Sequence, residues 1–151
     1  MIRELPVPLI GYPEAQLVRM GDIIGTLSIG SCSAVLLVGD QDSSHMVFGH
    51  VRAGNGFFDT SVLQQAVRYM SDDVSLFCIG GGEYVFNNAS LQLERASQIS
   101  TIQEQVQRVG FRLPKKRIST FWNGTRRAYN NMLVKTSSSA SWVARVELVY
   151  S

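Results

Sequence analysis

The sequence is poor in the residues that stabilise disulfide-rich and metal-bound domains. Among 151 residues it has only two cysteines, Cys32 and Cys78, and two histidines, His45 and His50. Two cysteines are too few for a disulfide framework, and neither a Cys-x-x-Cys nor a His-x-x-x-His spacing occurs. We therefore expect no metal and no cofactor, and a reducing cytoplasm is the default location.

Long apolar runs are also missing. No segment approaches the ~20 apolar residues of a membrane span, and Met1–Pro6 includes an acid and a proline, unlike a signal peptide. We expect no membrane insertion. The length, with 45% hydrophobic and 17% charged residues, fits a globular chain that buries its own core. We therefore predict a single domain over residues 1–151.

Acidic residues are absent between Glu104 and Glu147. Residues 1–104 carry 5 basic and 11 acidic side chains, a net of −6, whereas residues 105–151 carry 9 and 1, a net of +8. Such asymmetry suggests nucleic acid, a membrane surface or an acidic protein as partner. A solvated basic face without a partner is the alternative.

Most of the periodic segments predict β-strands. Consecutive apolar residues over 32–38 are typical of a strand buried on both faces, and the turn-forming residues at 39–44 separate it from a second strand at 46–51. These segments predict a hairpin. Further strands are expected at Asp22–Ile29, Val74–Ile79, Arg117–Phe121, Ala128–Lys135 and Trp142–Tyr150.

Two segments have helical periodicity. The first begins at Asp59 or Thr60, either of which can cap it, and one stripe carries its apolar residues: Val62, Leu63, Ala66, Val67 and Met70. The second spans about Ser97–Val109 and ends at Gly110, a residue suited to a left-handed C-terminal cap. The chain is therefore predicted to be an α+β domain with mixed or largely antiparallel sheets and two main helices.

Cys32 and His50 are the candidates for chemistry. In the predicted hairpin, Cys32 begins the first strand and His50 lies near the end of the second, so both stand at the open end. His45 lies at the loop end instead. A cysteine thiolate attacks carbon centres and a nearby histidine handles its proton. The alternative is a buried structural cysteine, which is the interpretation we give to Cys78.

The segment around Cys32 adds a family signature. Residues 26–35 read TLSIGSCSAV, which resembles the Thr-Leu-x-x-Gly-Ser-Cys-x-Ala-Val pattern of the CheD chemoreceptor glutamine deamidases. The same core occurs in cytotoxic necrotizing factor toxins and a Burkholderia lethal factor. The resemblance extends over about residues 20–135 through four further segments: Met46–Val51, Phe57–Asp59, Phe77–Gly81 and Gly124–Arg127.

The resemblance implies a CheD-like fold and deamidation of a protein glutamine. Cys32 would attack the carboxamide, His50 would carry the proton to the leaving ammonia, and Thr26 would orient the imidazole. Water would then hydrolyse the thioester. Gly30 would let the substrate approach closely, and Ser31 and Ser33 would add polar contacts. Chemoreceptors would be the substrates and a CheC-like phosphatase a regulator.

Other functions stay open. A toxin or effector deamidase would be secreted and would act on a host protein. A non-catalytic relative could keep the fold for binding alone. A binding module could use Lys115–Arg117, Arg126, Arg127 and Trp122 to contact phosphates and stack on bases. No nucleic-acid motif accompanies these residues, so we expect the basic third to dock a negatively charged protein.

Overall fold

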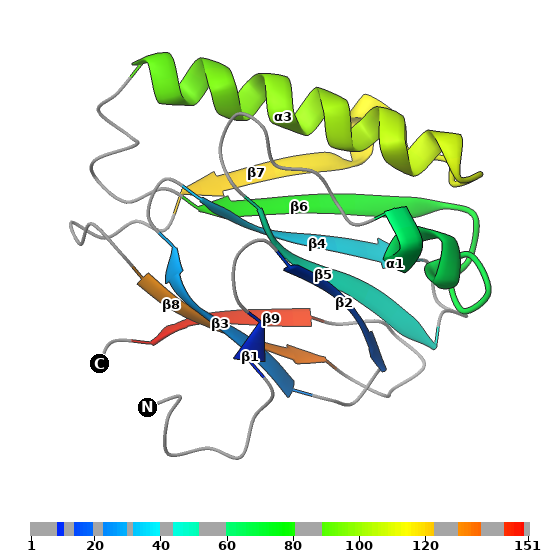
Figure 1. Cartoon of the computed structure of the whole chain (residues 1–151), viewed down its shortest axis with the longest axis horizontal. Helices are drawn as coiled ribbons and strands as arrows, with labels where there is room; N and C mark the ends of the chain where they lie inside the picture. Colours follow the sequence, from blue (N-terminus) through cyan, green and yellow to red (C-terminus); the bar gives the residue numbers. More distant parts are fainter. Residues whose placement is uncertain are drawn as a thin grey trace.

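The computed structural model describes residues 9–10, 14–19, 23–29, 32–39, 44–51, 60–80, 89–122, 130–136 and 144–149. Figure 1 shows the elements in these ranges. In chain order they are β1 (Leu9–Ile10), β2 (Glu14–Arg19), β3 (Ile23–Ile29), β4 (Ser33–Gly39), β5 (His45–Val51), α1 (Thr60–Ala66), β6 (Val74–Gly80), α3 (Ala89–Arg108), the 3-10 turn η2 (Lys115–Arg117), β7 (Ile118–Trp122), β8 (Asn130–Thr136) and β9 (Ala144–Val149).

The described strands form two mixed sheets. The five-stranded sheet has the order β2-β5-β4-β6-β7, and the four-stranded sheet has the order β1-β3-β8-β9. Neighbouring strands are antiparallel except for β6 with β7 and β1 with β3, which are parallel. The predicted α+β class, with mixed sheets and two helices, is confirmed.

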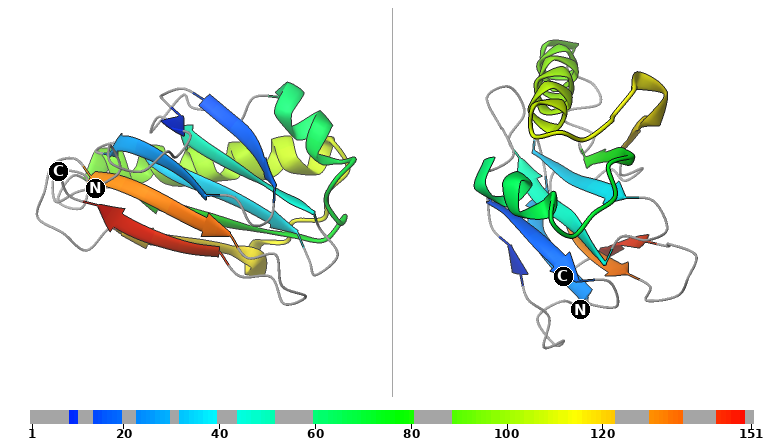
Figure 2. Two further views of the ribbon diagram at one scale, coloured as in Figure 1. Left: turned by 90° about the horizontal axis from the view of Figure 1, so that it is seen from below. Right: turned by 90° about the vertical axis from the view of Figure 1, so that its right-hand side faces the viewer.

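The five-stranded sheet is the middle layer of the molecule. On one face, α1 and α3 cover a large apolar cluster that includes Val35, Leu37 and Leu76. The other face carries a second cluster, built on Ala34, Leu36 and Phe48. Figure 2 shows the four-stranded sheet on this second side and α3 on the first. The layers are therefore helices, five-stranded sheet and four-stranded sheet.

Strand β4 forms because its residues are apolar on both sides of the pleat. Every residue from Ser33 to Gly39 is buried, which confirms the prediction of a strand enclosed on both faces. It pairs with β5 on one side and β6 on the other. β4 is the central strand of the five-stranded sheet. The candidate site residues beside it are therefore attached to a backbone that is hydrogen-bonded on both sides.

The helices differ from the sequence prediction at their ends. α1 ends at Ala66 and is followed by a turn, so Val67, which was predicted on the buried stripe, is 40% exposed. α3 begins at Ala89, eight residues before the predicted start. Gly110 does adopt a positive φ of 113° after α3, as a C-terminal glycine cap requires. Neither described helix has both the length and the apolar character needed to cross a membrane.

Two strands were not predicted at all. β1 and β2 precede Asp22, where the first strand was expected. β2 joins the sheet as the antiparallel neighbour of β5, and Val18 is 4% exposed there. Trp142, Val143 and Tyr150 of the last predicted strand, and the cap candidate Asp59, lie outside the described residues.

Candidate active site

The register of β4 and β5 brings Cys32 and His50 together. Ser33 pairs with Val51 and Ala34 pairs with His50, so the predicted hairpin is confirmed. Cys32 directly precedes Ser33 and therefore stands diagonally across from His50, two residues from its pairing partner. Diagonal cross-strand neighbours lie about 7–8 Å apart at Cα, with their side chains closer. The register therefore places both residues at the open end of the hairpin.

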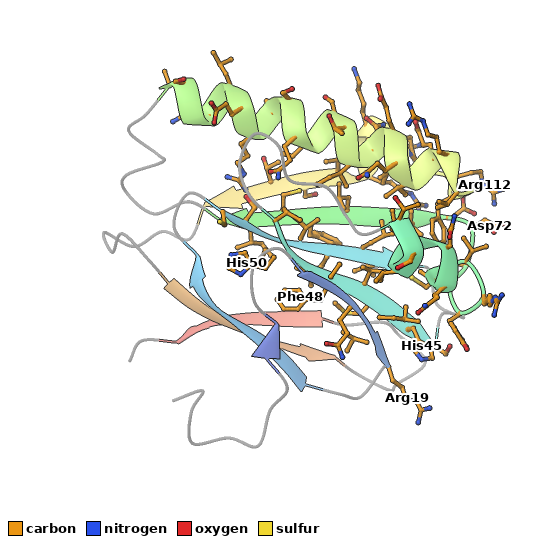
Figure 3. The ribbon with its side chains drawn as sticks, viewed as in Figure 1. Arg19, His45, Phe48, His50, Asp72 and Arg112 are labelled. Carbon is orange, nitrogen blue, oxygen red and sulfur yellow. The ribbon has the colours of Figure 1, made fainter. Side chains whose placement is uncertain are left out.

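Both side chains belong to the sheet face opposite the helices. Residues two apart on a strand share a face, so Cys32 lies on the side of Ala34, and directly paired residues also share a face. Cys32 packs against the same cluster as Ala34 and Phe48. Figure 3 shows His50 and Phe48 on the side of the five-stranded sheet that faces the four-stranded sheet. The pair therefore lies between the sheets, at one end.

The exposure of the two residues suits a nucleophile and its base. Cys32 is half-buried. His50 is 3% exposed, and its Nε2 atom is buried. A substrate carbonyl can reach an edge thiol, while an enclosed imidazole is held in place and shielded from bulk water.

Thr26 lies on the facing sheet. It is part of β3, where it pairs with Ile10 of β1 and Met132 of β8. The β3–β8 register shifts between Thr26 and Ile29, and such a bulge bends a strand and re-aims its residues. β3 then leads to Cys32. β3 belongs to the four-stranded sheet, which lies on the side of the five-stranded sheet that carries His50, and the role of Thr26 in orienting the imidazole stays a prediction.

The proposed substrate contacts are only partly described. Gly30 and Ser31 lie outside the described residues. Ser33 is 1% exposed and pairs with Val51 and with Gly80, the last residue of β6. Within the described structure its Oγ has no hydrogen-bond partner. Val51 belongs to the cluster under the helices, so Ser33 points to the face opposite Cys32.

The other cysteine and histidine are separate from this pair. Cys78 is 1% exposed, and burial raises the pKa of its thiol to about 12. Its interpretation as a core residue is confirmed. His45 begins β5, five residues or about 17 Å along the strand from His50. There it contacts the Tyr69 ring, with centroids 4.5 Å apart, and its Nδ1 lies 2.7 Å from Ser44 Oγ.

The residues proposed for the binding module do not all lie at one end of the five-stranded sheet. β7 runs parallel to β6, with Ile118 beside Leu76 and Trp122 beside Gly80. Lys115–Arg117, just before β7, therefore lies at the end opposite Cys32, whereas Trp122 ends at the Cys32 side. Figure 3 shows Arg112 and His50 at these opposite ends. Arg126 and Arg127 lie outside the described residues.

A groove of about 480 Å³ is lined in part by Lys116 and Arg117. Its lining includes Lys116, Arg117, Arg112 and a single acid, Asp73. Arg112 holds that acid in a two-bond ion pair, Nε to Oδ1 at 2.7 Å and Nη2 to Oδ2 at 2.8 Å. This pairing keeps the pKa of Asp73 below its ordinary value. The groove is therefore electropositive.

Comparison of the chain with protein-family models and with curated proteins found no match. Three or more histidine, cysteine or acidic side chains do not gather into a possible metal site in the described part of the chain. The β4–β5 pairing confirms the predicted hairpin, and the roles of Cys32 and His50 stay predictions. Sequence reasoning treated Gly80, the last residue of β6, only as part of the resembling segment Phe77–Gly81.

Proposed function

We propose that this chain is a cysteine-dependent protein-glutamine deamidase. The observation that carries the proposal is the β4–β5 register, which puts the half-buried Cys32 diagonally across from the buried His50. The resemblance of residues 26–35 to the CheD signature supplies the substrate class. The same signature supports Thr26 as the third member of the site.

The reaction follows from the two side chains. The Cys32 sulfur attacks the glutamine carboxamide carbon while His50 takes the thiol proton. His50 then gives this proton to the nitrogen, so the C–N bond breaks and ammonia leaves. Water, deprotonated by His50, adds to the thioester and expels the thiolate, leaving glutamate. Backbone N–H groups near Cys32 would stabilise the oxyanion.

Ammonia release from a purified chemoreceptor cytoplasmic fragment tests this mechanism. Cys32→Ser and His50→Ala are each expected to abolish release, since one removes the nucleophile and the other the proton carrier. Cys78→Ala and His45→Ala are the matched controls, because they remove the other cysteine and histidine and should retain activity. Undiminished release by Cys32→Ser would reject the mechanism.

The cellular setting is proposed on the same basis. A chemoreceptor substrate places the enzyme in the cytoplasm, with a CheC-like regulator, whereas an effector would be secreted and would act on a host protein. Peptide mass spectrometry distinguishes them, because conversion of glutamine to glutamate marks the modified protein. Conversion in a host extract but not in chemoreceptors would favour the effector.

A docking role for the basic groove is the second proposal. Three cationic side chains line it against one acid that is already paired with Arg112. Such a surface attracts an acidic protein segment and speeds encounter with it. Because the groove lies at the far end of the sheet, it would bind a part of the substrate or regulator that is distant from the segment at Cys32. Salt should weaken this binding.

A further inference from the structure

Gly80 occupies a position that cannot accept a side chain. A Cβ atom built on it would lie 2.7 Å from the Cys32 carbonyl oxygen and 2.8 Å from the Ser33 Cα. It would also lie 3.0 Å from Ser33 Oγ. The two shortest contacts are with backbone atoms, which cannot rotate away as the end of a side chain can. Any residue other than glycine would therefore push against the backbone that enters β4.

The requirement at Gly80 is for space. Among the described glycines, positive φ occurs at Gly110 and not at Gly80. Gly80 thus has a backbone conformation that other residues adopt freely. Its missing Cβ instead allows a close approach of two chains, at the point where Cys32 forms a bend before β4.

The bend controls the direction of the Cys32 side chain. Ser33 and Ala34 are fixed by their pairs on β5, whereas Cys32 is the first residue before the strand. A shift of its carbonyl oxygen rotates the Cys32–Ser33 peptide and swings the thiol relative to His50. We propose that Gly80 is a positioning residue, whose lack of a side chain lets this peptide lie against β6 and so aims Cys32 at His50. This inference rests on the proposed role of Cys32 as nucleophile.

Gly80→Ala and Gly110→Ala make a matched pair for the test. Both add one methyl group to a glycine. At Gly110 the φ of 113° makes alanine strained, but no atom lies within 4 Å of its Cβ, so the fold is weakened far from Cys32. The measurement is the rate of iodoacetamide alkylation of Cys32 against pH, in variants shown by circular dichroism to be folded.

We expect Gly110→Ala to keep the wild-type alkylation profile. In Gly80→Ala the rate should fall by about tenfold, because a small misplacement of a reacting group is costly. Its pH midpoint should move by about one unit toward that of an ordinary thiol. An unchanged Gly80→Ala profile would overturn the proposal. A wild-type profile like that of free cysteine would instead reject the nucleophile, which is a different failure.

A double variant separates the backbone contacts from the side-chain contact. Adding Ser33→Ala to Gly80→Ala removes Ser33 Oγ but leaves both backbone contacts, so the reactivity of Cys32 should stay low. Recovery would assign the clash to Ser33 and reject the role of the Cys32 backbone. If Gly80→Ala does not fold, the test is repeated with Ser33→Gly added, because a glycine at 33 gives the backbone that enters β4 the freedom to shift away from the new methyl group. Failure of both to fold would make Gly80 a requirement of the fold alone and would end the proposal.

Discussion

The guanidinium of Arg95 donates a hydrogen bond from Nη2 to the carbonyl oxygen of Cys78, 2.9 Å away. Arg95 comes from α3 and is 4% exposed, and burial lowers its pKa. The bond therefore joins the helix layer to β6, beside the central strand. A buried cation is tolerated only where polar groups surround it, so this contact is part of what holds α3 against the sheet.

Replacing Arg95 by alanine should destabilise the protein. The Cys78 carbonyl would lose its donor, and the long side chain would leave a cavity. We expect the free energy of unfolding to fall by about 2–4 kcal/mol. Urea titration measures it. Arg108→Ala, on the exposed end of the same helix, should change it by about 0.5 kcal/mol or less. Equal losses in the two variants would contradict the structural role of Arg95.

The two cysteines should differ in reactivity in the folded protein. Cys78 is enclosed, and with its pKa raised to about 12 only about one thiol in 10⁴ is ionised at pH 8. Cys32 is only half-buried, and the proposed mechanism makes it the nucleophile. Iodoacetamide at pH 8 should therefore modify Cys32 alone, and both cysteines in urea. Peptide mass spectrometry reads the sites, and labelling of Cys78 before unfolding would show that the core opens more readily than we infer.

Alkaline pH should weaken the fold through Cys78. Its thiol has an ordinary pKa of 9.0 when unfolded and about 12 when folded, so the unfolded chain loses the proton first. This contribution is complete below about pH 9 and falls by about 1.4 kcal/mol per pH unit above it. Urea titrations at pH 8 and pH 10 should show a steeper decline for the wild type than for Cys78→Ala. Parallel declines would assign the loss to other groups.

Charge reversal at the basic groove should separate docking from chemistry. In Lys116→Glu with Arg117→Glu, which reverses two of the cations that line the groove, binding of an acidic protein partner should weaken because the attraction becomes repulsion. Alkylation of Cys32 should be unchanged. The sheet from Leu76 to Gly80 alone spans about 13 Å, more than the screening distance of about 8 Å in physiological salt. A changed alkylation profile would mean that the groove communicates with the site.

The sequence predicted those elements in which the buried residues are apolar and the exposed residues are polar. The hairpin from Cys32 to Val51 was foreseen because its strands are apolar and its loop is polar. The first half of α3 was not, because its buried side includes Arg95 and Gln98, 4% and 1% exposed, while Leu93 is 73% exposed. Hydrophobic periodicity fails where a helix buries polar side chains.

The strand β2 and the lack of space at Gly80 were not predicted because both depend on contacts between segments that are distant in the sequence. The run Glu14–Arg19 has charged ends and a glutamine within it, and it becomes a strand by adding to β5. Gly80 looks like any glycine at the end of a strand, and only the packing of β4 against β6 shows what it must avoid. The placing of Cys32 and His50 at one end of the hairpin needed only the length of the hairpin, which the sequence does contain.

The central position of β4 also affects which parts of the protein open locally. Strands at the rim, such as β2 and β7, can detach in local openings of low free energy, whereas a central strand exchanges its amide hydrogens only in larger ones. Cys32 is joined directly to that central strand. The thiol should therefore keep its place during the rapid, small fluctuations in which the rim of the sheet exchanges with deuterium.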